Sequence, residues 1–291
     1  MGKAKRIRTN RKHSVEMQEV RPERLWGVET SGYYFLKIIA VISMFLWYFS
    51  FAFYLPLEIP DKAFYYMQML GHISYPLLAY LVTESYFHTT NKLRHLVIMF
   101  VITIASEMPY DLIVFDRKFE PEMQSPAGSL TFAFLALCLT NINYKNALKV
   151  FYKSETTRAI VSLSLKVILL GLCGVLCVVL NTEFEWKGIL LVFIFSKCRK
   201  TKLRMLIQLF AVAVFVELTM KISLMNLAYF FALIPIWLMQ LKRSYPNRFV
   251  KIKQLEFIPK ICSSRPMKYT ARYFYPVMLW GMCLALYFLK K

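Results

Sequence analysis

The chain has 291 residues, of which 57% are hydrophobic, and it carries a formal net charge of +20 at pH 7. A mean hydropathy of +0.44 excludes an ordinary soluble domain. The basic residues lie mainly between apolar runs, which favours membrane topology over nucleic-acid binding as the reason for the positive charge. The sequence therefore predicts an integral membrane protein and makes nucleic acid an unlikely partner.

Most of the chain consists of apolar segments. Several approach the length of about 20 residues that an α-helix needs to cross a bilayer. Residues 1–30 are predicted to form a basic cytoplasmic tail on anionic lipid, and residues 31–291 a transmembrane domain. We predict about nine spans (eight to ten), at residues 34–55, 67–87, 93–115, 128–141, 159–180, 186–197, 203–218, 223–241 and 270–289. The fourth, sixth and seventh are short, which leaves a count of eight open.

The loops between these spans differ in charge. Most of the 37 Lys and Arg residues fall in alternate loops, and the acidic loop residues fall in the others. The positive-inside bias then predicts a cytoplasmic N-terminus and an outer C-terminus. The longest basic loop, residues 242–269, contains a segment suited to lie on anionic lipid at the inner face. The predicted fold is an all-α, polytopic membrane bundle in the cell membrane, of the bacterial inner-membrane type.

Two ionisable residues lie near the cytoplasmic end of the second predicted span. Glu84 is followed at i+4 by His88, so both lie on one helical face. Such groups are costly inside a bilayer and mark functional sites. Removal of a proton from a substrate needs a base, and either residue can serve. We predict both as catalytic, with Glu84 as the general base. The alternative is that Glu84 only pairs with Lys37, with Arg94 or with a helix terminus.

Further polar residues lie in the second and third predicted spans. Glu107 and Asp111 straddle Pro109, which frees a backbone carbonyl that a neighbouring helix must satisfy. We predict Glu107 as a catalytic residue that orients the substrate, or as a partner of His72. Asp111, His72 and Tyr80 are predicted substrate contacts, although Asp111 also suits the membrane interface. Metal binding by His72, Glu107 and Asp111 is disfavoured, because their spacing is generic.

Three sequence segments resemble those of a known family. They are Gly71–Pro76, Leu81–Asn91 and Ser106–Asp111. With fainter matches at Leu36–Met44 and Tyr273–Pro276, the chain resembles the TraX family of polytopic membrane proteins, named for the conjugation protein that acetylates pilin subunits. The resemblance implies acetyl transfer from cytosolic acetyl-CoA. The acceptor would be an amine or a hydroxyl of a membrane-associated peptide, lipid or glycan.

The chain departs from this family pattern at three positions. Relatives carry an acidic residue and then a histidine in the first span, where this sequence has Trp47 and Tyr48. In the last span relatives carry a histidine, where this sequence has Met278. Three functional hypotheses therefore stay open. The chain is an acetyltransferase, a non-catalytic scaffold or pseudoenzyme that keeps the fold, or a transporter, for which buried charge and proline kinks are the support.

Overall fold

The structure is a computed structural model that describes residues 23–148, 151–152, 154–199, 201, 203–219, 225–244 and 265–289. Within these residues the regular secondary structure is helical, apart from one isolated bridge between Gln124 and Thr182. The predicted all-α class is confirmed. Most of the predicted basic tail, residues 1–30, and most of the predicted loop 242–269 lie outside the described residues.

Helices occupy all nine predicted spans. The described helices are α2 (Glu23–Phe53), α3 (Asp61–Gly71), α4 (Ser74–His88), α5 (Lys92–Val114), α6 (Pro126–Thr140), α7 (Tyr144–Ala147), α8 (Glu155–Val179), α9 (Glu185–Cys198), α10 (Arg204–Thr219), α11 (Ala228–Phe231), α12 (Leu233–Ser244) and α15 (Arg265–Leu289). The short helix α7 lies in the loop between the fourth and fifth predicted spans. The second predicted span corresponds to α3 and α4 together, and the eighth to α11 and α12. The first helix begins at Glu23, earlier than predicted.

The break between α3 and α4 has a local cause. Pro76 has no backbone N–H, so the carbonyl of His72 cannot receive the usual helical hydrogen bond. Gly71 ends α3 where the chain passes directly against Trp47 of α2, and a Cβ at this position would collide with that indole. The span is therefore kinked at residues 72–76, and α2 packs along both of its halves.

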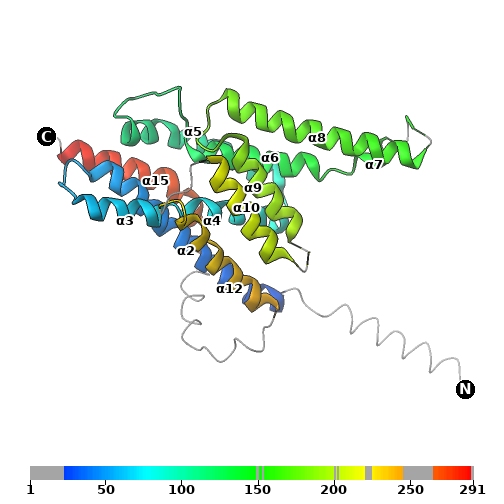
Figure 1. The fold of residues 1–291 in the computed structure, drawn as a ribbon, viewed down its shortest axis with the longest axis horizontal. Helices are drawn as coiled ribbons and strands as arrows, with labels where there is room; N and C mark the ends of the chain where they lie inside the picture. Colours follow the sequence, from blue (N-terminus) through cyan, green and yellow to red (C-terminus); the bar gives the residue numbers. More distant parts are fainter. Residues whose placement is uncertain are drawn as a thin grey trace, which may run out of the picture.

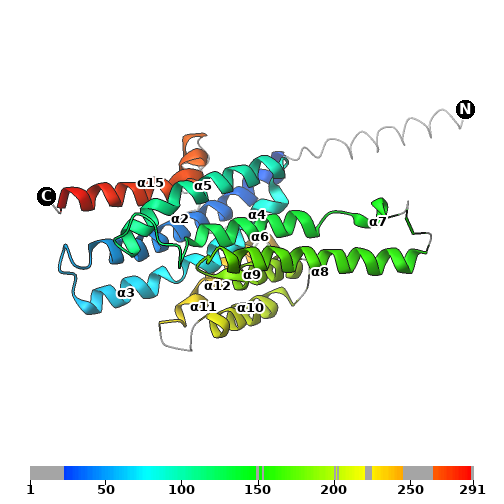
Figure 2. The same cartoon turned by 90° about the horizontal axis from the view of Figure 1, so that it is seen from above.

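Helix α4 lies inside the bundle, packed against α2, α6 and α9 (Figures 1 and 2). Helices α5 and α15 pack together, and α8 runs along the edge of the bundle beside α6 and α9. Apolar side chains of α8 such as Leu163, Val167 and Leu172 are exposed. This outer face of α8 suits contact with lipid.

Among the residues that the structure describes, three helical segments are long and apolar enough to cross a membrane: Phe35–Phe53 of α2, α5 and α8. Shorter apolar helices run over Pro126–Thr140, Ala228–Leu241 and Tyr273–Leu289. The number of nine spans and the cytoplasmic N-terminus stay predictions.

Helix α15 supplies the hydrogen-bond donor that was predicted for the carbonyl left free by Pro109. The carbonyl left free by Pro109 is that of Ala105, and the indole Nε1 of Trp280 donates to it at 3.1 Å. The Sγ atom of Cys283 also lies 3.5 Å from the carbonyl oxygen of Pro109. These contacts fix α5 against α15.

The two ends of the bundle differ in their polar groups. Helices α4 and α9 both end where His88 and Arg199 meet, whereas the loops 115–125 and 180–184 meet at the other end. We call the first the inner end and the second the outer end, following the predicted topology.

Candidate functional site

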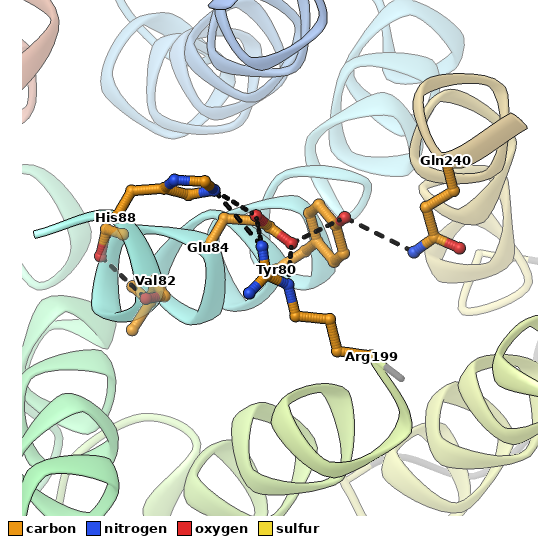
Figure 3. A network of polar contacts seen from close by, with 7 residues as sticks. Tyr80, Val82, Glu84, His88, Arg199 and Gln240 are labelled. Carbon is orange, nitrogen blue, oxygen red and sulfur yellow. Dashed lines mark hydrogen bonds and ion pairs between the residues drawn. The ribbon is translucent and has the colours of Figure 1, made fainter. Parts of the chain in front are cut away.

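Glu84 is a buried carboxylate near the end of α4, with an exposed fraction of 3%. Arg199, which directly follows α9, forms a bidentate ion pair with this carboxylate (Figure 3). Its Nε donates to Oε1 at 3.2 Å and its Nη2 donates to Oε2 at 3.1 Å. Such bidentate geometry fixes the relative orientation of both groups. The ion pair therefore ties the inner ends of α4 and α9 together.

His88 completes this site one helical turn further along α4. Its Nε2 lies 3.0 Å from Oε2 of Glu84 and 3.4 Å from Nη2 of Arg199. The side chain is 40% exposed. A neutral imidazole that donates from Nε2 to Glu84 leaves Nδ1 as an acceptor, a tautomer inferred from the hydrogen-bond network. Nδ1 has no hydrogen-bond partner among the described residues.

Tyr80 and Gln240 extend the network into the bundle. The Tyr80 hydroxyl donates to Oε1 of Glu84 at 3.2 Å, and Gln240 of α12 donates to the Tyr80 hydroxyl at 3.5 Å (Figure 3). Tyr80, predicted as a substrate contact, thus supports Glu84 directly. The carboxylate receives hydrogen bonds from Tyr80, His88 and Arg199, so its acceptor positions are largely filled.

The pairing of Glu84 with Arg199 was missed by sequence reasoning, which weighed Lys37, Arg94 and a helix terminus as partners of Glu84. Lys37 lies over the ring of Tyr33, at 4.5 Å from its centroid. The observed partner, Arg199, lies 115 positions from Glu84 in sequence. The sequence feature that could have indicated Arg199 is the basic segment at the end of the sixth predicted span. The charge pattern of the loops places this segment on the inner side of the membrane, the same side as Glu84.

The turn after α4 explains why His88 faces the inner end. Helix α4 ends at His88 because Thr89 adopts an extended backbone, and Asn91 then caps α5 by accepting a hydrogen bond from the backbone N–H of Arg94 at 2.9 Å. A histidine in the last turn also lies favourably near the negative end of the helix dipole. The short turn keeps Glu84 and His88 on one face beside α9.

Glu107 and Asp111 lie at the outer end, away from Glu84. Glu107 accepts two hydrogen bonds from Ser125, from its backbone N–H at 3.0 Å and its hydroxyl at 2.9 Å. Asp111 is fully buried, and its Oδ2 accepts from the backbone N–H of Glu120 at 3.0 Å. Its Oδ1 has no hydrogen-bond partner in the described part of the chain.

His72 lies apart from both carboxylates. Its ring stacks on Tyr229, with 4.9 Å between centroids, and the proposed pairing of His72 with Glu107 is therefore wrong. Over the residues that the structure describes, no three His, Cys, Asp or Glu side chains come together as metal ligands would. The predicted site residues thus divide into an inner group around Glu84, an outer group around Glu107, and His72.

The model of the family described as TraX protein matches residues 33–284, which is most of the chain. The chain belongs to the TraX family. No match is found among curated proteins or among solved structures. Membership, together with three long apolar helices, makes this TraX-family chain a membrane protein.

The positions where the TraX resemblance fails come together in space. Tyr48 and Met278 are buried in the same apolar cluster between α2 and α15, with exposed fractions of 2% and 7%. The Tyr48 hydroxyl lies 2.8 Å from that of Tyr275, and Trp47 meets the Tyr48 ring edge-on. A tyrosine hydroxyl donates a hydrogen bond but does not accept a proton near neutral pH. This TraX chain therefore lacks a basic group at these positions.

Proposed function

We propose that this TraX-family protein is a membrane acyltransferase that moves an acetyl group from cytosolic acetyl-CoA to a membrane-associated acceptor. The acceptor would present an amine or a hydroxyl on a peptide, a lipid or a glycan. The observation that carries the proposal is the joined set of Glu84, His88 and Arg199. It places a carboxylate, an imidazole and a guanidinium within hydrogen-bonding distance of one another.

The geometry supports different roles for Glu84 and His88 than the sequence indicated. Glu84 was predicted as the general base, but its oxygens already accept from three side chains. A buried carboxylate that holds one imidazole nitrogen leaves the other free to act as a base. We therefore assign the base to Nδ1 of His88 and the orienting role to Glu84.

The proposed reaction moves one proton and one acetyl group. The acceptor nitrogen or oxygen attacks the thioester carbon as Nδ1 of His88 removes its proton. A C–N or C–O bond forms, the C–S bond breaks, and the proton passes to the departing thiolate. Glu84 stabilises the imidazolium between these steps because their side chains are 3.0 Å apart.

The inner end offers charge that fits a donor bearing phosphates. Arg199 lies over the ring of Phe87 at 4.5 Å from its centroid, which holds the guanidinium in place. Lys92 and Lys197 lie over Tyr86 and Phe193 at this end. Basic groups of this kind bind phosphate oxygens. Acetyl-CoA would supply the activated thioester, and these residues would hold its charged portion.

The outer group is proposed to contact the acceptor. Glu107 would orient it, as the sequence predicted, and Asp111 and His72 would contact other parts of it. Tyr80 would act through Glu84, since its hydroxyl donates to that carboxylate.

A non-catalytic scaffold is the second candidate, and Tyr48 and Met278 favour it. At both positions relatives carry histidine, and here both side chains are buried in an apolar cluster. A protein that had lost acetyl transfer would keep the helical bundle while changing these positions.

The two candidates are separated by acetyl-CoA binding and thioester cleavage, measured on the full-length protein in detergent. The enzyme hypothesis expects saturable binding and thiol release. Removal of the base in His88→Gln should lower turnover by about 100-fold or more. Glu84→Gln should lower it as well. Glu155→Gln is the matched control, since Glu155 is exposed at the start of α8. No binding by folded wild-type protein would refute the acyltransferase and favour the scaffold.

A further inference from the structure

The exposed apolar face of α8 ends at a defined residue on the inner side. This face runs from Ile160 to Val179 and includes Leu163, Val167 and Val175. At about 1.5 Å per residue it is roughly 28 Å long, close to the hydrocarbon thickness of a bilayer, about 30 Å. A face of this length fits the hydrocarbon layer when Ile160 lies at its inner boundary. The residues that precede Ile160 then lie at the level of the lipid headgroups.

Helix α5 has a similar face that begins at the same end of the bundle. Its exposed apolar side chains recur at helical spacing, and they are Leu93, Val97, Val101, Ile104 and Met108. Helix α6 packs against both α5 and α8. The ring of His95, in the first turn of α5, lies 4.9 Å from that of Phe134 in α6. Helix α6 therefore connects the two lipid-facing helices toward their inner ends.

The chain between α6 and α8 carries further exposed apolar side chains. They are Ile142, Phe151 and Tyr152, and the Phe151 side chain is 79% exposed. The backbone N–H of Phe151 donates to the carbonyl of Leu148 at 3.2 Å, and α7 packs beside α8. In both overall views this end of α8 extends beyond α9 and α10 (Figures 1 and 2). Phe151 thus lies outside the packed body of the bundle.

Two arginines accompany these apolar side chains. Arg94 is exposed and directly follows Leu93, and Arg158 is half-exposed, two positions before Ile160. Neither arginine forms an ion pair within the described part of the chain. In sequence, the segment 142–160 also contains Lys145, Lys149 and Lys153 against the single acid Glu155. Uncompensated basic charge at this level attracts anionic headgroups.

These exposed residues combine the two properties that bind a protein to a lipid surface. We call Arg94, Ile142, Phe151, Tyr152 and Arg158 the inner rim. Aromatic side chains are typical of the boundary between water and hydrocarbon, where an apolar ring inserts and a hydroxyl reaches the headgroups. A soluble acidic partner would match the charge of the arginines. It would not explain why the inner rim lies where two lipid-facing helices end.

We propose that the inner rim binds anionic phospholipids, with Phe151 inserted at the hydrocarbon boundary and Arg94 and Arg158 contacting headgroup phosphates. This surface goes beyond the proposed acyl transfer and does not depend on it. The sequence predicted anionic lipid at residues 1–30 and in the loop 242–269. The inner rim is a separate surface, carried by α5 and by the chain between α6 and α8.

The test uses full-length protein in nanodiscs that contain equal amounts of phosphatidylglycerol and phosphatidylcholine with the same acyl chains. Phe151 is replaced by p-benzoyl-L-phenylalanine, which on irradiation bonds covalently to a neighbouring C–H group. Mass spectrometry of the intact protein then identifies the lipid adducts. We expect phosphatidylglycerol adducts to exceed phosphatidylcholine adducts by about threefold or more, since basic side chains concentrate anionic lipid beside them.

Two arginine variants and two matched controls locate the effect. With the probe at residue 151, Arg94→Gln combined with Arg158→Gln should lower the ratio of the two adducts by about twofold or more. Lys118→Gln should leave the ratio unchanged, because Lys118 is exposed in the loop at the outer end. The same probe at Phe119, which is exposed beside Lys118, should give nearly equal adducts of the two lipids.

Several results would overturn the lipid surface. They are nearly equal adducts at residue 151 in folded protein, an equal excess at residue 119, or an unchanged ratio in the double arginine variant. Adducts to a copurifying protein or nucleic acid in place of lipid would assign the inner rim to a soluble partner instead. Should the double variant fail to fold, Arg94→Gln and Arg158→Gln decide the question singly. Loss of acetyl transfer in Glu84→Gln leaves the adduct ratio unchanged, so the two proposals are tested separately.

Discussion

The Glu84–Arg199 ion pair predicts an unequal response to removal of its two members. Arg199→Met keeps the length of the side chain but leaves Glu84, whose side chain is 4% exposed, without its cation. Glu84→Gln keeps the shape of the acid but leaves Arg199, which is 20% exposed and can turn its guanidinium toward water. The arginine substitution should therefore destabilise the protein more.

The magnitudes follow from these exposed fractions. Breaking a buried pair by removal of one partner costs about 3–5 kcal/mol. Because the hydrogen bond from His88 to Glu84 at 3.0 Å remains, we place Arg199→Met near the lower limit, at about 3 kcal/mol. Glu84→Gln loses charge-assisted hydrogen bonds but strands no buried charge, and should cost about 1.5 kcal/mol. The double variant should cost less than the sum of both, by at least about 1 kcal/mol.

The assay is a double-mutant cycle in mixed detergent micelles. Unfolding by sodium dodecyl sulfate, followed by tryptophan fluorescence, gives the free energy of unfolding for wild type, both single variants and the double variant. If the losses of unfolding free energy in the two single variants add up to the loss in the double variant, the side chains do not interact. The bidentate ion pair would then be refuted. A larger cost for Glu84→Gln than for Arg199→Met would refute the argument from burial.

Two further predictions concern the outer half of the bundle. Trp280→Phe leaves the Ala105 carbonyl without its donor, which should cost about 0.6–1 kcal/mol of unfolding free energy. Trp186→Phe, at a comparably exposed indole, should be near neutral, and equal costs would contradict the bond. Because burial raises the folded pKa of Glu183 from 4.5 to about 8, wild-type stability should fall as pH rises from about 4.5 to 8, by at most about 1.4 kcal/mol per unit. Glu183→Gln should flatten this dependence, and an unchanged slope would exclude Glu183 as its source.

The sequence predicted the features that depend on positions close together in the chain. Glu84 and His88 lie on one face because four residues make about one helical turn, and the structure brings them to 3.0 Å. The kink after Gly71 and the need of Pro109 for a partner follow from proline chemistry alone. Helix positions also agreed closely with the apolar runs, since the backbone must satisfy its own hydrogen bonds in lipid.

Contacts between helices were decided only by the tertiary structure. Arg199 as the partner of Glu84, Trp280 as the donor to Ala105, and the burial of Asp111 could not be read from spacing. In a soluble protein, an apolar stripe shows which helix face turns inward. In a membrane bundle, the lipid-facing and the packed faces are both apolar, so that signal is lost. The contacts within one helix could thus be predicted from the sequence. The contacts between side chains of different helices depended on how the helices pack.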